Sequence, residues 1–417
     1  MYRKTVLPNG VRIVTQGFTS RTVSVGIWVD AGSRDEDQGI NGSAHFVEHM
    51  LFKGTTTRSA AQIGMEFDVL GGMSNGFTTQ EITCYYATVL KDKVEALVDL
   101  LSDIFLNSAF SSDEVLRERD VILQEISMVD DSPDEQIHDI FPGILWGEHP
   151  LGNTILGSRK VIGAMTREKL CSFIEQFYSP EKILVAAAGP IEHVDFVALV
   201  EKSFSRVDRD HGSSERRVPS FIPAGRQVIP KQLEQEHLIL GAEAPPATSP
   251  DRYKLLLLNT VLGGNMSSRL FQEIREKQGL AYAVYSYVAS YIDTGYMGIY
   301  LGVDPGSANR ALALVAQETK RILQEPVSSQ ELENAKDYAK ANLLLSADSM
   351  ETRMMQLARN ELLFERSFSL EEIIASLESV SAGDLTEVAQ HIFGGRELSL
   401  AAVGPLPEEE IEGVKFS

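Results

Sequence analysis

The sequence has few cysteines, no long apolar run and no recognisable signal peptide. Only two cysteines, Cys84 and Cys171, occur among 417 residues, which argues against a disulfide framework and against a zinc site built on cysteine. No apolar run approaches the roughly 20 residues that a membrane-spanning helix needs, and the first residues turn polar too soon for a signal peptide. We therefore expect a cytoplasmic protein; a matured organellar protein would have the same features.

Basic residues are scarce relative to acidic ones. The chain has 38 Lys and Arg against 59 Asp and Glu, which gives a net charge of −21. Such an acidic protein is not expected to have nucleic acid or an anionic membrane as its main partner. Small molecules and peptides, basic peptides among them, are the partners that this charge allows. The 43% of hydrophobic residues is typical of a soluble globular protein, and the length allows two or three domains.

The chain resembles itself at a nearly constant offset. Residues Ile183–Ile191 match Leu398–Leu406 at an offset of 215, and the helical stretches before them match at the same offset. Residues Glu114–Arg119 match Lys336 and the five residues before it at an offset of 217. Chance similarity of apolar strands and amphipathic helices is the alternative. Three matches in the same order favour an internal duplication.

The duplication predicts the domain organisation. We expect an N-terminal half at 1–210, a polar linker at 211–225 and a C-terminal half at 226–417; the motif described next makes the first the zinc-binding half and leaves the second without zinc. In each half, alternating strands precede helical periodicity, without regular alternation of the two. This pattern predicts an α+β fold in which each half is an antiparallel sheet with helices packed on one face.

The most specific motif is His45-Phe-Val-Glu-His49. On a helix capped by Ser43 and ended by Gly54, the two histidines lie one turn apart and can bind one metal ion. Neutral imidazole suits Zn²⁺, and Glu48 beside it can serve as a general base. The alternative is two ordinary helix histidines with a charged neighbour. The residue order is that of an inverted zinc-peptidase motif, which favours zinc.

A catalytic zinc site needs a third protein ligand. The predicted helix at 113–129 carries Glu118 and Glu125 on its apolar stripe, where a carboxylate is costly unless it is paired or bound to metal. Ion pairs with Arg117 or Arg119 would satisfy both carboxylates equally well. The pattern alone leaves the role of Glu125 open between ligand and ion-pair partner.

Several further segments stand in the same order as the motifs of one enzyme family. With Glu125 placed 76 residues after His49, the chain resembles the pitrilysin family of zinc metallopeptidases. Within it, the chain is most similar to the branch of the mitochondrial processing peptidase β subunit and its bacterial homologues. The segments that carry the resemblance are 45–49, 71–78, 117–125, 149–157, 262–271 and 278–282.

The resemblance implies a metal site and a reaction. His45, His49 and Glu125 would hold one Zn²⁺ per chain, and Glu118 would support a ligand histidine from outside the first ring of ligands. Glu48 would assist the attack of zinc-bound water on a peptide bond. The implied activity is that of a zinc endopeptidase that cleaves unfolded peptides or presequence-like segments.

The resemblance also implies residues that handle the substrate. Asn75 would hydrogen-bond the substrate backbone, and Gly76 departs from the alanine that is common there. Arg275 and Tyr282, in the half without zinc ligands, would act on the scissile region from the opposite wall of a clamshell. A homodimer would then complete each active site in trans.

Two other functions fit the same sequence. One is a non-catalytic scaffold or core-type subunit with this fold, although the intact ligand set and Glu48 argue against it. The other is a zinc hydrolase that acts on small molecules. Chelator-sensitive peptide cleavage distinguishes the endopeptidase from both.

Overall fold

The computed structural model describes residues 2–208 and 216–414, which fall into two compact units. Each unit takes most of its residues from one half of the sequence and a segment from the other half. Residues 211–215 of the predicted linker lie outside the described residues. Unit 1 comprises Met1–Met128, Asn153–Arg217 and Ser346–Ser367, and unit 2 comprises Val129–Gly152, Val218–Leu345 and Phe368–Ser417.

Unit 1 is built on a six-stranded sheet with the strand order β1-β2-β6-β3-β5-β4. All neighbouring strands are antiparallel except β2 and β6, which pair in parallel. Among the described strands, the edge strand β4 pairs only with β5, with Asn75 opposite Tyr86. The strands are β1 (Tyr2–Val6), β2 (Arg12–Gly17), β3 (Thr22–Val29), β4 (Met73–Thr78), β5 (Thr83–Leu90) and β6 (Ile183–Gly189).

Strand β3 shows why this sheet is covered on both faces. Every second residue from Val23 to Val29 is buried in the main core of the unit, as expected for period-two alternation. Trp28 points to the opposite face, where it packs with Met354. At Gly26 a side chain would collide there, since a Cβ would lie 2.9 Å from Met354 Sδ.

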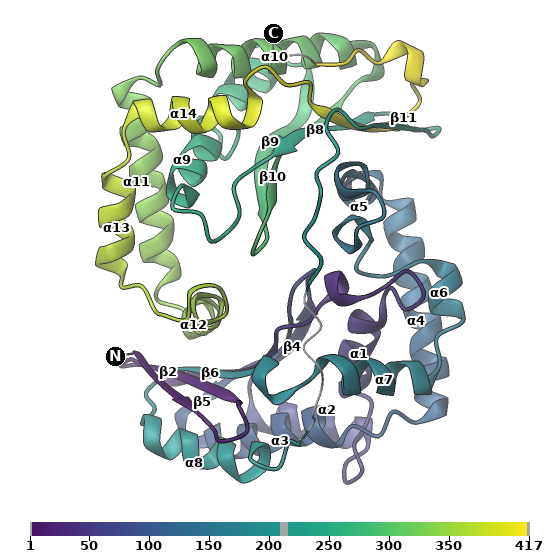
Figure 1. Cartoon of the computed structure of the whole chain (residues 1–417), viewed down its shortest axis with the longest axis vertical. Helices are drawn as coiled ribbons and strands as arrows, with labels where there is room; N and C mark the ends of the chain where they lie inside the picture. Colours follow the sequence, from purple (N-terminus) through teal and green to yellow (C-terminus); the bar gives the residue numbers. More distant parts are fainter. Residues whose placement is uncertain (1, 209–215, 415–417) are drawn as a thin grey trace. The chain divides into compact units, whose positions relative to one another are not determined.

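The helices of unit 1 lie on both faces of its sheet. Figure 1 shows α12 end-on against the face opposite to α3 and α8. Helix α12 comes from the second half of the sequence and buries Met354, Leu357 and Ala358 on the first sheet. The helices are α1 (Ser43–Leu51), α2 (Ala60–Leu70), α3 (Val94–Asn107), α4 (Ser112–Asp131), α6 (Arg159–Gly163), α7 (Arg167–Phe177), α8 (His193–Phe204) and α12 (Met350–Phe364).

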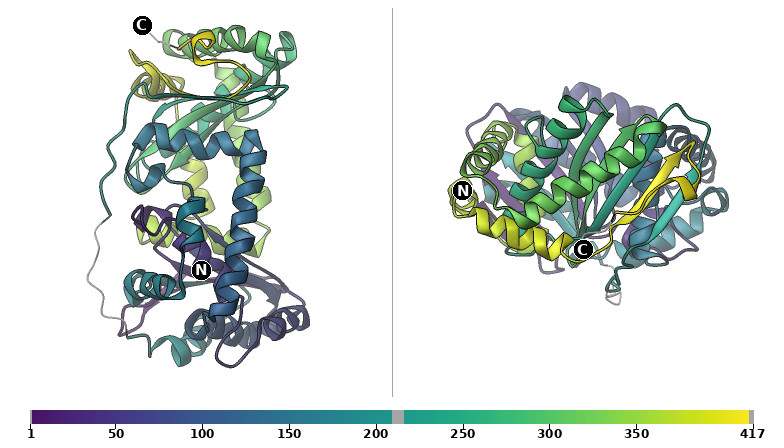
Figure 2. Two further views of the ribbon diagram at one scale, coloured as in Figure 1. Left: turned by 90° about the vertical axis from the view of Figure 1, so that its right-hand side faces the viewer. Right: turned by 90° about the horizontal axis from the view of Figure 1, so that it is seen from above.

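Unit 2 repeats this plan on a five-stranded sheet with the strand order β7-β11-β8-β10-β9. Helix α5, from the first half of the sequence, packs on β11 and β8, and the right-hand view of Figure 2 shows α10 lying across the strands. The strands are β7 (Arg226–Pro230), β8 (Glu236–Glu243), β9 (Ala281–Ser290), β10 (Gly295–Val303) and β11 (Ser399–Gly404). The helices are α5 (Pro133–Trp146), α9 (Arg252–Leu262), the π-helix η5 (Phe271–Lys277), α10 (Ala308–Gln324), α11 (Ser329–Ser346), α13 (Leu370–Glu378) and α14 (Ala382–Phe393).

The two strand orders confirm the duplicated α+β fold. In each sheet the last strand of the half, β6 or β11, lies between an early parallel partner and an antiparallel strand. The sheets are thus mainly antiparallel, with one parallel pair each. Beyond the helices expected on one face, α12 and α5 cover part of the other face.

His237, in the interior strand β8, has its Nδ1 2.8 Å from Tyr300 Oη. One local expectation needs correction. Ser43 does not cap α1, because Gly42 holds the capping position and Ser43 donates its hydroxyl to the Ile40 carbonyl. Among the described residues, no helix has both the length and the apolar character that crossing a membrane requires.

Candidate metal centre

Helix α1 presents its polar residues on one side of an otherwise buried segment. It is fixed on unit 1 by a set of buried residues, namely Ser43, Ala44, Phe46, Val47, Met50 and Leu51. His45, Glu48 and His49 are only partly buried. The helix follows Gly42, whose φ of +93° suits glycine, and ends at Leu51, before Gly54. The i, i+4 spacing therefore brings both imidazoles to one accessible face.

The structure brings His45, His49 and Glu125 together. The two imidazole rings have centroids 4.6 Å apart. Glu125, on α4, places Oε2 3.7 Å from His45 Nε2 and Oε1 3.7 Å from His49 Nε2. One ligand atom from each residue lies within 4.8 Å of the other two, and the described residues contain no other such group. Two nitrogens and one carboxylate oxygen make a typical donor set for catalytic zinc.

Glu118 orients His49 by contacting Nδ1, the ring nitrogen that does not face Glu125. Its Oε2 lies 3.1 Å from His49 Nδ1, and its Oε1 accepts from Lys53 Nζ at 2.8 Å. A carboxylate at Nδ1 favours the tautomer that carries its proton there, which leaves Nε2 free to bind metal. Glu118 is only 4% exposed, so this arrangement also satisfies a buried charge.

The ion pairs of Glu118 and Glu125 with Arg117 or Arg119, the alternative that the sequence left open, do not form in the structure. Arg117 is paired with Glu114, and Arg119 donates to the Met165 carbonyl. Glu118 is buried on the apolar stripe, as the sequence predicted, and Glu125 faces the histidines.

Glu48 is oriented by a residue of the edge strand β4. Thr78 Oγ1 donates to Glu48 Oε2 at 2.6 Å. Burial raises the pKa of Glu48 above its usual range, and the hydrogen bond from Thr78 lowers it. A carboxylate of raised pKa beside a metal centre is suited to accept a proton and return it.

His45 is electrostatically suited to bind a cation. Burial, and next the nearby His49, lower the pKa of His45 to about 3. His45 is therefore neutral at physiological pH, the form that binds a metal. The residues present thus fit a zinc ion.

Asn75 and Gly76 lie on β4 near the base. Asn75 is exposed, and its Oδ1 accepts from the Gly76 amide at 2.9 Å. At Gly76 a Cβ would lie 3.2 Å from Glu48 Cγ, so this glycine leaves room beside the base. The edge strand and the motif helix therefore meet at Glu48.

Arg275 and Tyr282 belong to unit 2, whereas the metal cluster belongs to unit 1. The Arg275 guanidinium stacks on the Phe271 ring at 4.7 Å in the π-helix η5, and Tyr282 is 79% exposed on β9. An exposed tyrosine on a strand is available for contact with a partner. The catalytic roles of both residues stay a prediction.

Sequence reasoning missed two residues that contact the glutamates beside the cluster, Glu48 and Glu118. Thr78 was part of the recognised segment 71–78, but nothing in the spacing assigned it to Glu48. Lys53, four residues after His49 and just beyond the end of α1, was not considered, although this spacing from His49 was a usable signal.

Comparison with known proteins adds independent findings. The family described as "Insulinase (Peptidase family M16)" matches residues 12–159, which include the whole cluster. "Peptidase M16 inactive domain" matches residues 164–338. The chain belongs to peptidase family M16. The M16 assignment confirms the pitrilysin-type resemblance.

Bacterial M16 relatives cover nearly the whole chain. The Bacillus subtilis protein named uncharacterized zinc protease YmxG is 37% identical over 406 residues, 97% of this chain and 98% of its own. The Mycobacterium tuberculosis protein named uncharacterized zinc protease Rv2782c is 38% identical over 412 residues, 97% of this chain and 93% of its own.

Solved structures share the M16 fold at low sequence identity. A protease from Helicobacter pylori has a TM-score of 0.91 at 23% identity and covers 97% of this chain and 99% of its own. A structure from Pseudomonas fluorescens, titled as a peptidase M16 inactive domain, has the same TM-score at 20% identity and covers 97% of this chain and 98% of its own. At these identities the likeness concerns the fold.

Proposed function

We propose that this protein is a zinc-dependent endopeptidase that cleaves unfolded peptides or presequence-like segments. The observation that carries the proposal is the convergence of His45, His49 and Glu125 beside Glu48. The names of the M16 relatives, which call them zinc proteases, support it.

His45, His49 and Glu125 would hold one Zn²⁺ per chain, which would supply a Lewis acid that polarises a peptide carbonyl and acidifies water. Glu48 takes a proton from the attacking water and passes it to the leaving amine nitrogen. Thr78 holds the Glu48 carboxylate in place during both transfers. Glu118 keeps the proton of His49 on Nδ1.

The substrate would bind as an added strand on β4. In the part of the chain that the structure describes, this strand pairs only with β5, and Met73, Ser74 and Asn75 are exposed on it. The backbone N–H and C=O groups of an extended peptide can form hydrogen bonds with such an edge strand, and Asn75 can provide a further polar contact. This mode requires an unfolded segment, and the net charge of −21 favours basic ones.

A homodimer would complete each site in trans. In this part of the proposal Tyr282 stabilises the oxyanion that forms during attack, and Arg275 holds a substrate carbonyl. The exposure of Tyr282 supports it, since a residue that acts on a partner's substrate must be reachable. We further propose that the enzyme acts in the bacterial cytoplasm, which cell fractionation tests.

The proposal is tested with purified protein and four variants. Wild type should bind about one zinc per chain and cleave a peptide mixture, with cut sites mapped by mass spectrometry. His45→Ala, His49→Ala and Glu125→Ala should lose both metal and cleavage. Glu48→Gln should keep metal and lose cleavage, and wild-type turnover in this variant would refute the role of Glu48.

The same assay separates the endopeptidase from its rivals. A scaffold subunit would keep zinc and its fold but cleave no peptide. A small-molecule hydrolase would act on small esters or amides and leave peptides intact. Cleavage that stops on addition of a chelator and returns with zinc supports the endopeptidase.

A further inference from the structure

Glu36 is a buried carboxylate close to the start of α1. It is 1% exposed and receives three hydrogen bonds, all from N–H groups. Its Oε2 accepts from Asn41 Nδ2 at 3.0 Å and from the Gly42 amide at 2.7 Å. Its Oε1 accepts from the Ala44 amide at 2.6 Å.

Only hydrogen-bond donors surround the Glu36 carboxyl group. All three partners donate, and two of the donors are amides at the N-terminus of α1, where the helix dipole also favours a negative charge. Burial raises the pKa of Glu36 to about 8, and the hydrogen bonds from Ala44, Gly42 and Asn41 oppose this rise. A glutamine in the same place would turn an NH2 group toward these donors and leave an amide donor of α1 unpaired.

The segment before α1 is fixed from a second side. Asn41 Nδ2 also donates to the Thr154 carbonyl at 3.1 Å. Gly42 and Gly157 bring two backbones into close contact, since a Cβ at Gly157 would lie only 2.4 Å from the Asn41 carbonyl oxygen. Glu36 therefore ties α1 to a segment that is itself held in place.

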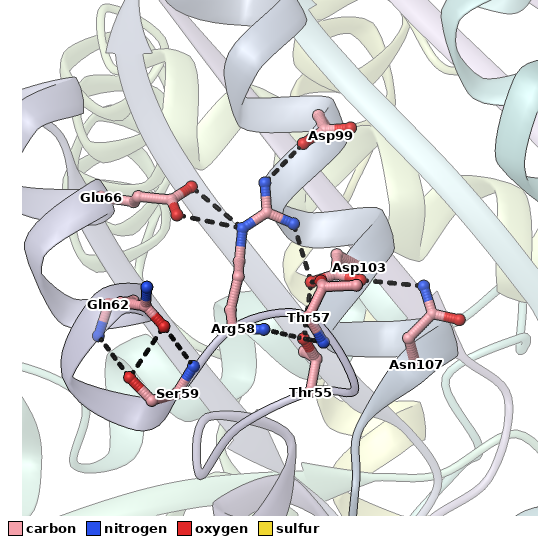
Figure 3. Close-up of polar contacts among 9 residues, drawn as sticks. All are labelled: Thr55, Thr57, Arg58, Ser59, Gln62, Glu66, Asp99, Asp103 and Asn107. Carbon is pink, nitrogen blue, oxygen red and sulfur yellow. Dashed lines mark hydrogen bonds and ion pairs between the residues drawn. The ribbon is translucent and has the colours of Figure 1, made fainter.

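The other end of α1 is anchored independently. Ser108 Oγ donates to the Met50 carbonyl at 3.1 Å. Figure 3 shows the loop after the helix, where Arg58 donates to Asp103 at 2.7 Å and Asp103 also accepts from Thr55 at 2.8 Å. With the C-terminal end anchored in this way, the N-terminal contacts fix the remaining freedom of the helix.

We infer that Glu36 is a positioning residue for the metal centre. By holding the first turn of α1, it sets the depth and rotation of the helix that carries His45, Glu48 and His49. His45 follows Ala44 directly, so a shift of the first turn moves its imidazole relative to Glu125. The inference rests on the proposed function only in taking the cluster to be a zinc site.

The test compares Glu36→Gln with wild type and with Glu361→Gln. Glu361 is a matched control, because it is also buried in unit 1 but binds Tyr2 and Lys4 and holds α12 rather than α1. Zinc affinity is measured by competition with a chelator, at a temperature where circular dichroism shows all three proteins folded. Glu36→Gln should bind zinc roughly tenfold more weakly than wild type, and Glu361→Gln should bind it as wild type does.

A second readout does not involve metal. In the apo proteins, hydrogen exchange of the amides of residues 43–51 should be faster in Glu36→Gln than in wild type and unchanged in Glu361→Gln. Unchanged zinc affinity together with unchanged exchange in α1 would overturn the inference, as would an equal effect of both substitutions.

Two further outcomes keep this inference distinct from the proposed function. If wild type cleaves no peptide but Glu36→Gln still loosens α1 and weakens zinc binding, the endopeptidase proposal fails and the positioning role stands. If Glu36→Gln does not fold, Asn41→Ala keeps the carboxylate and removes one donor. It should then show a smaller change in the same direction, and wild-type values for it would reject the inference.

Discussion

Thr78 and Glu48 are joined by a hydrogen bond of 2.6 Å that links the edge strand β4 to the motif helix α1. The strand β4, on which we expect the substrate to bind, therefore also orients the expected general base, Glu48 of α1, through this hydrogen bond. Correct placement of a base relative to its substrate contributes strongly to catalysis, because a misplacement of about 1 Å can cost on the order of 10²-fold in rate.

Thr78→Val should lower kcat by roughly tenfold and leave KM and zinc content unchanged. Valine keeps the shape of threonine but cannot donate to Glu48, so only the orientation of the base is lost. Steady-state kinetics and metal analysis measure the effect. Thr88→Val is the control, since Thr88 bonds Ser24 in the same sheet and not Glu48. A wild-type kcat for Thr78→Val would contradict the prediction.

Glu118→Gln should weaken zinc binding by about 10- to 100-fold, the usual cost of losing a partner behind a metal-binding histidine. The amide no longer provides a charged acceptor for His49 Nδ1. Lys53→Met is the control, because it removes the other partner of Glu118 and leaves the bond to His49. Chelator competition compares the three proteins. If Lys53→Met weakens zinc as much as Glu118→Gln, the effect comes from general loss of the network.

The metal cluster was predictable to the extent that its geometry is local. The i, i+4 spacing of His45 and His49 fixes their common face as soon as the segment is helical. Glu125 lies 76 residues further on, and only the packing of α4 against α1 brings it to the histidines. Pattern alone left its role open, and the family resemblance supplied it.

The duplicated fold was predictable from the offset between matching segments, but the place of α12 was not. Its helical character follows from periodicity, and Met354 reads as a core residue. That the core is the sheet of the first half depends on contacts such as Met354 with Gly26, more than 300 residues away. Sequence periodicity contains no information on which sheet a buried face meets.

Arg58→Met should destabilise the protein by about 2 kcal/mol. Arg58 contacts the carboxylates of Glu66, Asp99 and Asp103 (Figure 3). Glu66 and Asp99 are exposed to solvent, whereas Asp103 is buried. The loss of stability therefore arises from leaving the buried Asp103 carboxylate without its cationic partner. Asp99→Asn should therefore change stability by less than about 0.5 kcal/mol. Urea denaturation measures both, and equal losses for the two variants would contradict this ranking.

Glu331 should make the free energy of unfolding decrease as the pH falls into the acidic range. Burial opposes its ionisation, but hydrogen bonds from Arg269 and Ser328 outweigh it and lower the pKa of Glu331 to about 2. A carboxyl whose pKa is lower in the folded state stabilises fully above its unfolded pKa of about 4.5, and this contribution is lost as the pH falls toward 2.

Glu331→Gln should therefore cost about 1–2 kcal/mol at pH 7, a figure reduced to allow for the partial exposure of the side chain. The difference from wild type should shrink between pH 4.5 and pH 3 in urea denaturation. Glu333→Gln, which alters an exposed carboxylate on the same helix, should show little effect at either pH. A difference that is constant with pH would show that the ion pair with Arg269 is not its source.

Complementation tests whether Tyr282 acts in trans. Glu48→Gln chains and Tyr282→Phe chains should each be nearly inactive, with a loss on the order of 10²-fold or more for Tyr282→Phe if the hydroxyl stabilises an oxyanion. In a mixed homodimer that shares residues across subunits, one site carries both substitutions and the other carries neither. Activity should then recover toward half that of wild type within the mixed dimers, with exchange verified by differently tagged chains. If exchange occurs and activity does not return, either the two residues act within one chain or Tyr282 has no part in the reaction. The activity of Tyr282→Phe measured alone separates these two cases, since only the first leaves it impaired.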